Sequence, residues 1–338
     1  MKYFSTFSGI GGFEKGIHNV IPNAECIGFS EIDKHAKAIY QYHYPNHTDY
    51  GDITAINVRQ LPDFNLLVGG FPCQAFSIAG KRQGFKDTRG TLFFDVARIL
   101  KAKQPEWVLL ENVKGLLSHE GGKTLGTILG VLTELGYSVG WEVVNSCHFG
   151  VPQNRERIFI VGHLTKAGGR TREVFPVREN DQLSATKNES GKRLSQAELS
   201  TTVRDGIGSK ADGTFIVNNR GTTEERDIST CLDANYYKGI DNHAQRTMVS
   251  SGTWRTHNDE PSFTLTSQDK HGVQIDHSIR RLTPVECERL QAFPDNWTAK
   301  GIIDGEEVEI SDTQRYKTLG NSVTTSVIQA IMTKLISI

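Results

Sequence analysis

A cysteine in a glycine-led loop is the residue whose chemistry stands out most in this sequence. Cys73 lies in GGFPCQAFS (residues 69–77), directly after an apolar run. A thiolate is a strong nucleophile, but a free thiol has a pKa of about 8.5 and needs a positive neighbour or a helix end to ionise near neutral pH. Cys26 and Cys147 lie beside apolar residues and are expected to be small core side chains. The loop therefore predicts an exposed nucleophile at Cys73.

A carboxyl group and two guanidinium groups could serve such a nucleophile. Glu111 follows the apolar run WVLL (residues 107–110), and a half-desolvated carboxyl there would have a raised pKa and could hold or deliver a proton. Arg155 and Arg157 occupy alternate positions of QNRER (residues 153–157), which puts them on one side of a strand. A run of this kind is ordinarily a surface salt-bridge ladder. Only closeness to Cys73 and Glu111 would give the two arginines a catalytic role.

A glycine loop and three acidic residues could bind an adenosine cofactor. FSGIGGF (residues 7–13) lets backbone amides approach an anionic group, although a structural tight turn is the alternative. Because the loop lacks the full G-x-G-x-x-G spacing, a dinucleotide is less favoured than another adenosine cofactor. Glu31, at the end of the next predicted strand, could accept both ribose hydroxyls. Asp33 is expected at a helix start, and Asp52 is either an adenine contact or a turn or N-cap residue.

Short apolar runs alternate with helical patterns in the first half of the chain, which predicts a parallel sheet wrapped by helices. The predicted strands are Tyr3–Phe7, Cys26–Phe29, Leu66–Val68, Trp107–Leu110, Val139–Val144 and Ile158–Val161, and the predicted helices are Phe13–Val20, His35–Tyr42, Leu92–Lys101 and Thr124–Leu135. Ligands of such sheets bind outside the carboxyl ends of the strands. The glycine loop, Glu31, the cysteine loop and Glu111 all follow predicted strands, so we expect one site.

From about Lys166 the sequence becomes rich in Ser, Thr, Asn, Asp and Gly, which predicts a second, loop-rich domain. Helical spacing returns at Pro284–Gln291 and at Val323–Ile336, and the last of these is expected to pack on the first domain. Similar segments around Ser200, Ser229 and Ser262 indicate either three strand-loop units or chance use of β-prone residues.

Composition narrows the class of protein. The 338 residues carry 38 Lys plus Arg against 39 Asp plus Glu and are 37% hydrophobic, which is typical of a globular chain of two domains. No apolar run reaches the roughly 18 residues of a membrane span, and the N-terminus does not resemble a secretion signal. Five cysteines without a Cys-x-x-Cys pair fit neither a disulfide framework nor a zinc site. We expect a cytoplasmic protein. Its nearly balanced net charge does not by itself indicate a binding partner.

Taken together, eight ordered elements resemble the cytosine-5 DNA methyltransferases of bacterial type, which use S-adenosylmethionine. The matching elements are the cofactor loop Phe7–Gly12, the ribose acceptor Glu31, the adenine contact Asp52, the nucleophile loop Pro72-Cys73-Gln74, the base-recognition element Glu111-Asn112-Val113, the arginine element 153–157, the bracing segments RLTP (281–284) and RLQAFP (289–294), and the C-terminal cofactor-pocket element YKTLGNSV (316–323).

The resemblance implies an α/β, Rossmann-like class I methyltransferase sheet with a smaller, strand- and loop-rich target-recognition domain. Residues 1–165 and 312–338 would form the catalytic domain, and residues 166–311 the recognition domain with its bracing segment. The resemblance implies S-adenosylmethionine as cofactor, S-adenosylhomocysteine as product, and no metal. Cofactor contacts are then expected from Phe7, Ser8, Gly9, Gly11, Gly12, Glu31, Ile32, Asp52, Ile53, Gly70, Pro72, Asn321, Ser322 and Val323.

The resemblance also implies the reaction. Cys73 would add to carbon 6 of a flipped cytosine, Glu111 would bind its N3 and amino edge, and Arg155, with Arg157 in the same element, would offset charge near the pyrimidine carbonyl. The base that removes the carbon 5 proton is not assigned. Double-stranded DNA would be the partner, with a cognate restriction endonuclease acting separately and the enzyme itself a monomer. DNA contacts are expected from Gln74, Ser77, Arg204, Arg220, Arg226, Arg246 and Arg255.

Three other functions were weighed: the same chemistry on RNA, an NAD-dependent enzyme with a catalytic cysteine, and an inactive DNA-binding module. The length of the recognition region argues against RNA as the substrate. The arginine element is unexplained by an NAD-dependent enzyme, and the presence of Cys73 and Glu111 argues against an inactive module. Two departures from the family pattern stand out. Ile32 replaces a frequent aromatic residue, which leaves stacking on adenine mainly to Phe7. Ala292 replaces a frequent Gly, which is harmless if the backbone there is helical.

Overall fold

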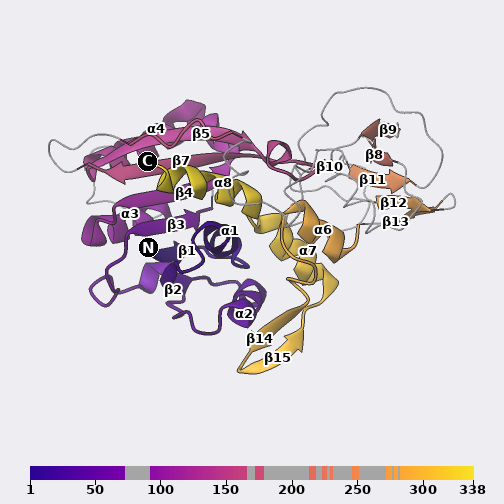
Figure 1. The fold of residues 1–338 in the computed structure, drawn as a ribbon, viewed down its shortest axis with the longest axis horizontal. Coiled ribbons are helices and arrows are strands. Elements are labelled where there is room, and N and C mark those ends of the chain that lie inside the picture. The colour runs from indigo at the N-terminus through magenta and orange to yellow at the C-terminus, as the bar shows by residue number, and fades with distance from the viewer. Residues whose placement is uncertain are drawn as a thin grey trace.

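The computed structural model describes residues 1–72, 92–165, 172–178 and 282–338, together with the backbone of six strands between residues 213 and 280. A six-stranded sheet in the order β2-β1-β3-β4-β7-β5 forms its centre (Figure 1). The strands are β1 (Lys2–Thr6), β2 (Glu25–Ser30), β3 (Leu66–Gly70), β4 (Trp107–Val113), β5 (Tyr137–Asn145) and β7 (Glu156–Leu164). All six predicted strands are confirmed.

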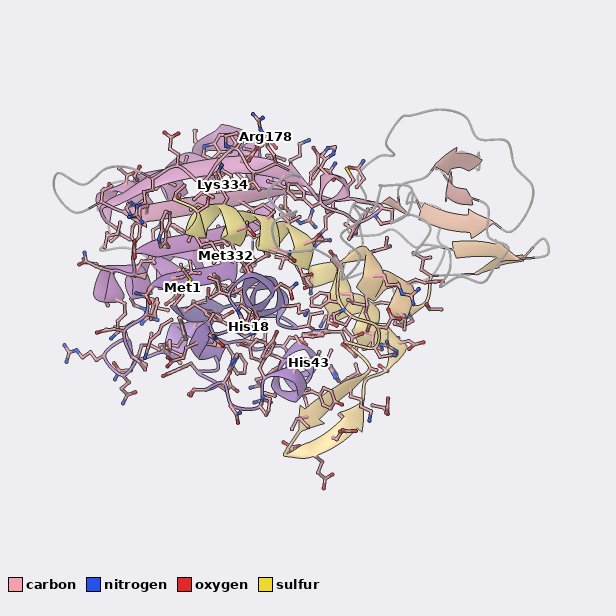
Figure 2. The ribbon with its side chains drawn as sticks, in the orientation of Figure 1. Met1, His18, His43, Arg178, Met332 and Lys334 are labelled. Atoms are coloured by element: carbon pink, nitrogen blue, oxygen red, sulfur yellow. The ribbon has the colours of Figure 1, made fainter. Side chains whose placement is uncertain are left out.

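Two pairs of helices cover the sheet because successive strand residues face opposite sides. Helices α1 (Gly12–Val20) and α8 (Thr325–Ile336) share a buried cluster with Tyr3 and Leu109. Helices α3 (Leu92–Lys103) and α4 (Lys123–Glu134) share another with Phe4 and Leu110. Met332 and Lys334, labelled in Figure 2, mark α8 on its face of the sheet. Since both faces are covered, the strands are apolar on both sides, which explains their continuous apolar runs.

The sheet is mixed, and the expectation of a wholly parallel sheet is wrong for one strand. Strands β2, β1, β3 and β4 are parallel, whereas β7 runs antiparallel to both β4 and β5. The connection from β5 to β7 holds only a short 3₁₀ turn, Ser146–His148, and the two-residue strand β6 (Gln153–Asn154). A parallel crossover needs a dozen or more residues, usually including a helix, and this connection is too short to provide one.

A third cluster joins the C-terminal segment to the first helices. It packs α2 (Lys34–His43) against α6 (Pro284–Leu290) and α7 (Asp312–Asn321), beside the hairpin of β14 (Lys300–Ile303) and β15 (Glu306–Glu309). The Trp297 indole stacks on His43, which Figure 2 labels, with ring centroids 3.6 Å apart, and its Nε1 donates to the Ile10 carbonyl at 2.9 Å. The C-terminal segment from residue 282 onward therefore supports the glycine loop.

The start of α6 follows a local sequence signal, and its end has a standard capping geometry with an unusual residue. Thr283 and Glu286 form a capping box with Pro284 at the first turn. At the other end the Phe293 amide donates to the Glu288 carbonyl and the Ala292 amide to the Arg289 carbonyl, which is the Schellman pattern. Ala292 has φ 58°, so its backbone is left-handed. The condition under which Ala292 would be a harmless replacement for Gly is therefore not met.

The strands of the second region form a separate sheet in the order β13-β12-β11-β8-β9, which lies beyond α6 and α7 in Figure 1. They are β8 (Gly213–Val217), β9 (Thr223–Arg226), β11 (Arg246–Ser250), β12 (Gly272–Ile275) and β13 (Ser278–Arg280). Strand β10 (Ser229–Thr230) pairs in parallel with β6. Ser200 and Ser262 of the internal echo lie outside the described residues. None of the helices that the structure describes is long and apolar enough to cross a membrane.

Candidate active site

A cavity of about 420 Å³ opens at the carboxyl ends of β1, β2, β3 and β4. Its volume lies within the range of small-molecule sites. The lining residues are Phe7, Gly9, Ser30, Glu31, Ile32, Asp33, Ala36, Asp52, Ile53, Gly70, Phe71, Pro72, Leu92, Glu111, Asn112, Val113, Arg155, Arg157, Thr318, Gly320 and Asn321. The structure thus gathers the four predicted features at one sheet edge.

The glycine loop and Glu31 are joined directly. One oxygen of the Glu31 carboxylate accepts from the Gly9 amide at 2.8 Å, and the other accepts from the Ile32 and Asp33 amides, also at 2.8 Å. Phe7 has φ 51°, a left-handed conformation that is costly for a bulky residue and typical of functional sites. The loop is therefore held in one shape, with the Phe7 ring and the Glu31 carboxylate at the cavity.

Five predicted cofactor residues lie behind the cavity wall: Ser8, Gly11, Gly12, Ser322 and Val323. A Cβ on Gly12 would lie 2.8 Å from both Ser322 Oγ and Val323 Cγ2, so α1 can approach the α7–α8 turn only with glycine there. Gly11 has φ 85° and N-caps α1. These residues shape the wall from behind.

The two aspartates both cap helices. Asp33 Oδ1 accepts from the His35 and Ala36 amides and N-caps α2, as predicted. Asp52 accepts from the Thr54 amide and caps the 3₁₀ helix Ile53–Ala55, which confirms its N-cap interpretation. Asp52 also lines the cavity, so the adenine contact stays a prediction.

Glu111 lies near the end of β4 beside a guanidinium group, with its side chain only 12% exposed. Its Oε1 lies 3.2 Å from Arg157 Nε. Burial raises the pKa of Glu111, and the charges of Arg157 and Arg155 oppose that rise. A Cβ on Gly70 would lie 3.0 Å from Glu111 Oε2, so glycine on β3 makes room for the carboxyl group. The site holds a carboxyl that retains its proton more readily than usual.

Asn112 connects Glu111 to the nucleophile loop. Its side chain is buried, and Nδ2 donates to the Phe71 carbonyl at 2.8 Å while Oδ1 accepts from the Val113 amide. Pro72 lines the cavity, and Cys73 is the next residue in the chain. Cys73, Gln74 and Ser77 lie outside the described residues. The backbone that leads into the predicted nucleophile is therefore fixed next to Glu111.

Arg155 and Arg157 both line the cavity, but they bind different partners. Arg155 is buried, and its Nη2 donates to the carbonyls of Gly320 at 3.0 Å and Ser322 at 2.8 Å. Glu156, between the two arginines, forms a surface ion pair of the kind that the salt-bridge ladder predicts, since its carboxylate accepts from Lys114 at 2.7 and 2.8 Å. Arg155 thus holds the α7–α8 turn, while Arg157 faces Glu111.

Sequence reasoning missed several lining residues, among them Ser30, Ala36 and Leu92, and it named Thr318 only as part of the C-terminal cofactor-pocket element. Small or apolar side chains give no chemical signal, although each of these lies within seven residues of a motif or predicted helix start. Among the predicted DNA contacts, Arg204, Arg220 and Arg255 lie outside the described residues. Arg226 ends β9 and Arg246 begins β11, and only their backbone is described. Cys147 is buried as predicted, whereas Cys26 is partly exposed.

Comparisons with known proteins agree on one family. The family model of C-5 cytosine-specific DNA methylases matches residues 1–337. The Type II methyltransferase M.NlaX of Neisseria lactamica is 36% identical over 98% of this chain and 94% of its own length. The Type II methyltransferase M.HpaII of Haemophilus parainfluenzae is 38% identical over 99% of this chain and 88% of its own length. The orphan methyltransferase M.SPRI of Bacillus phage SPR is 33% identical over 99% and 97%.

Solved structures share the fold. The Dnmt2 methyltransferase of S. pombe superposes with a TM-score of 0.61 at 17% identity, over 100% of this chain and 98% of that one. The methyltransferase EhMeth of Entamoeba histolytica superposes with a TM-score of 0.59 at 20% identity, over 100% and 98%. At these identities the likeness concerns the architecture, which is the predicted Rossmann-like methyltransferase sheet.

Proposed function

Because the chain belongs to the C-5 cytosine-specific DNA methylase family, we propose that it methylates carbon 5 of a flipped cytosine in double-stranded DNA through a covalent adduct of Cys73. The observation that carries the proposal is the single cavity in which the glycine loop, Glu31, Glu111 and the residue preceding Cys73 meet.

The cavity fits an adenosine cofactor, and S-adenosylmethionine is the one we propose. Glu31 is held by three backbone amides, two on Oε1 and one on Oε2, so Oε2 keeps a lone pair for a ribose hydroxyl. Ile32 is 72% exposed at the cavity and offers an apolar surface beside Phe7 for the adenine ring. When bound, the cofactor supplies an electrophilic methyl group on its sulfonium. Asp52, Gly70, Pro72 and Asn321 complete the proposed pocket.

Cys73 performs the first step on the substrate. Its thiolate adds to carbon 6, the new carbon–sulfur bond forms, and the electron pair of the 5,6 double bond becomes available at carbon 5. Glu111, whose pKa is raised by burial, binds N3 and the amino edge and stabilises the charge that develops as the thiolate adds. Loss of the carbon 5 proton later returns the electron pair that expels Cys73.

The two arginines support this chemistry in different ways. Arg157 contacts Glu111 and orients its carboxyl, and its guanidinium adds positive charge at the place where the pyrimidine would lie. Arg155 binds the carbonyls of Gly320 and Ser322 and so positions the C-terminal wall of the cofactor pocket. We propose Arg157 as the arginine closer to the reacting base and Arg155 as a positioning residue.

Access to the target requires extruding cytosine from the duplex at a cost of a few kcal/mol. The strand-rich region between residues 166 and 281 is the proposed source of the groups that fill the gap and read neighbouring bases. Its strand β10 pairs with β6, which directly precedes Arg155 in the chain. The proposed recognition region therefore contacts the catalytic domain next to the arginine element. Relatives of this chain are named both as Type II enzymes and as an orphan enzyme. A separate cognate endonuclease and a monomeric enzyme stay predictions.

The test is methyl transfer itself. Purified protein is incubated with labelled S-adenosylmethionine and DNA of varied sequence, and 5-methylcytosine is mapped at base resolution. We expect methylation of one cytosine within one short sequence context. Absence of transfer to DNA, or transfer only to a parallel sample of transfer RNA, would contradict the proposal.

A further inference from the structure

Two segments far apart in the chain build neighbouring parts of the cavity wall. The end of β2 and the start of α2 provide Glu31, Ile32, Asp33 and Ala36, and α7 provides Thr318, Gly320 and Asn321. Figure 1 shows α2 and α7 close together beside the sheet. The affinity for a ligand in this cavity depends on how these two segments are held.

One ion pair connects them beside the cavity. Lys317 Nζ lies 2.6 Å from Asp33 Oδ2, across 284 residues of sequence. The other Asp33 oxygen caps α2 by accepting from the His35 and Ala36 amides. One carboxylate therefore fixes the start of α2 and ties it to α7. Burial would raise the pKa of Asp33, but Lys317 and the Ala36 and His35 amides lower it below its usual value, so the Asp33 carboxylate is charged at neutral pH.

We propose that Lys317 is a positioning residue for the cofactor: its bond to Asp33 acts as a strap that holds α7 against the Glu31–Ala36 segment. The proposal rests on the proposed function and deepens it. Lys317 does not line the cavity. Its effect on the ligand therefore passes through two lining residues, its partner Asp33 and its neighbour Thr318 in α7.

The affinities of two ligands of different charge distinguish the proposed strap from a simple electrostatic effect of Lys317 on the cavity. The described lining carries four acidic side chains, Glu31, Asp33, Asp52 and Glu111, and two guanidinium groups, Arg155 and Arg157. Removing the Lys317 charge makes this region more negative. On charge alone, the cationic S-adenosylmethionine would then bind more tightly, and the net-neutral S-adenosylhomocysteine would bind unchanged. A loosened strap weakens both ligands alike.

The experiment measures dissociation constants of S-adenosylmethionine and S-adenosylhomocysteine by calorimetry, with kcat and KM from methyl transfer to DNA. The variants are Lys317→Met, which keeps the aliphatic stem, Lys317→Arg, which keeps the pair, and Asp33→Asn, which keeps an oxygen to cap α2. Lys300→Met is the matched control, since Lys300 forms a pair of the same length, 2.6 Å, with Glu307 on the exposed β14–β15 hairpin.

We expect Lys317→Met to raise both dissociation constants by roughly three- to tenfold, with KM for the cofactor rising and kcat at saturation nearly constant. Lys317→Arg and Lys300→Met should bind both ligands as the wild type does. The double variant Asp33→Asn with Lys317→Met should have dissociation constants no higher than those of the single variant that binds more weakly, because both changes remove the same ion pair. Unchanged binding of both ligands by Lys317→Met, or a change confined to S-adenosylmethionine, would overturn the strap. Failure of the wild-type protein to bind either ligand or to methylate DNA would instead overturn the proposed function.

Discussion

At the scale of single residues, the site combines a buried acid with a guanidinium that moderates it. Burial raises the pKa of Glu111, and Arg157, 3.2 Å away, partly reverses this. In the proposed reaction the protonated acid donates to cytosine N3. Activity should therefore fall as pH rises through the pKa of Glu111.

Arg157→Met should move that descending limb to higher pH, because it removes the charge that favours the carboxylate. Glu111→Gln should abolish the limb and lower kcat by about 10²- to 10⁴-fold, the range of acid–base contributions. Profiles of kcat against pH for the three proteins measure both effects. A limb unmoved by Arg157→Met would show that another group titrates.

A second buried acid lies beneath the glycine loop and affects stability. Glu14, in the first turn of α1, accepts from Tyr40 Oη at 3.0 Å, and burial raises its pKa from 4.5 to about 7. Between these values the folded chain binds a proton that the unfolded chain has released. The free energy of unfolding should thus fall by roughly 3 kcal/mol as pH rises from 4.5 to 7.

Denaturant titrations across this pH range test the role of Glu14. Glu14→Gln should remove most of the fall in stability, because its side chain has no proton to lose. Glu25→Gln is the control, since Glu25 is exposed and paired with Lys2. The explanation is wrong if the Glu14→Gln protein keeps the wild-type dependence on pH.

At the scale of elements, the turn after α6 carries strain that one substitution should relieve. Ala292 occupies the left-handed position of a Schellman motif at φ 58°. An L-residue costs about 1–2 kcal/mol there, and glycine costs roughly 0.5–1 kcal/mol through the entropy of the unfolded chain. Ala292→Gly should therefore stabilise the protein by about 0.5–1 kcal/mol.

Thermal and denaturant unfolding measure this difference. Ala102→Gly, on the exposed face of α3, is the control and should destabilise by about 0.5–1 kcal/mol. A destabilised Ala292→Gly protein would contradict the assignment of strain to this turn.

Elements whose signals are local could be predicted from the sequence. Apolar runs located the six strands of the central sheet, and helical spacing over Pro284–Gln291 located α6. The direction of β7 could not be read from its apolar run, because direction depends on the connection and not on the strand itself. The left-handed backbone of Ala292 was equally hidden, since alanine usually signals a helix.

Site residues divide in the same way. Glu31 and Glu111 are charged groups after apolar strands, and their positions in the cavity agree with the expectation. Ser30 and Ala36 carry no chemical signal. The pair of Asp33 and Lys317 spans 284 residues, and its existence depends on how α7 packs beside α2. Contacts of this kind follow from the tertiary fold alone.

At the scale of the whole molecule, the C-terminal segment connects the two regions. Gln153, the first residue of the arginine element, donates to the Leu290 carbonyl of α6, and α8 packs on α1. Strand β6 pairs with β10 of the second region. The chain therefore brings strand β10 of the second region, the arginine element and α6 into contact, an arrangement that agrees with the proposed action on an extruded base.

The most direct measurement is covalent trapping on DNA whose target cytosine carries fluorine at carbon 5. With S-adenosylmethionine present, we expect a complex that survives denaturation, because fluorine cannot leave as a proton does, and we expect the adduct on the peptide that contains Cys73. Cys73→Ser should form no complex, and Cys26→Ser should form as much as the wild type. Recovery of free protein alone from DNA that the enzyme otherwise methylates, or an adduct on a different residue, would contradict this expectation.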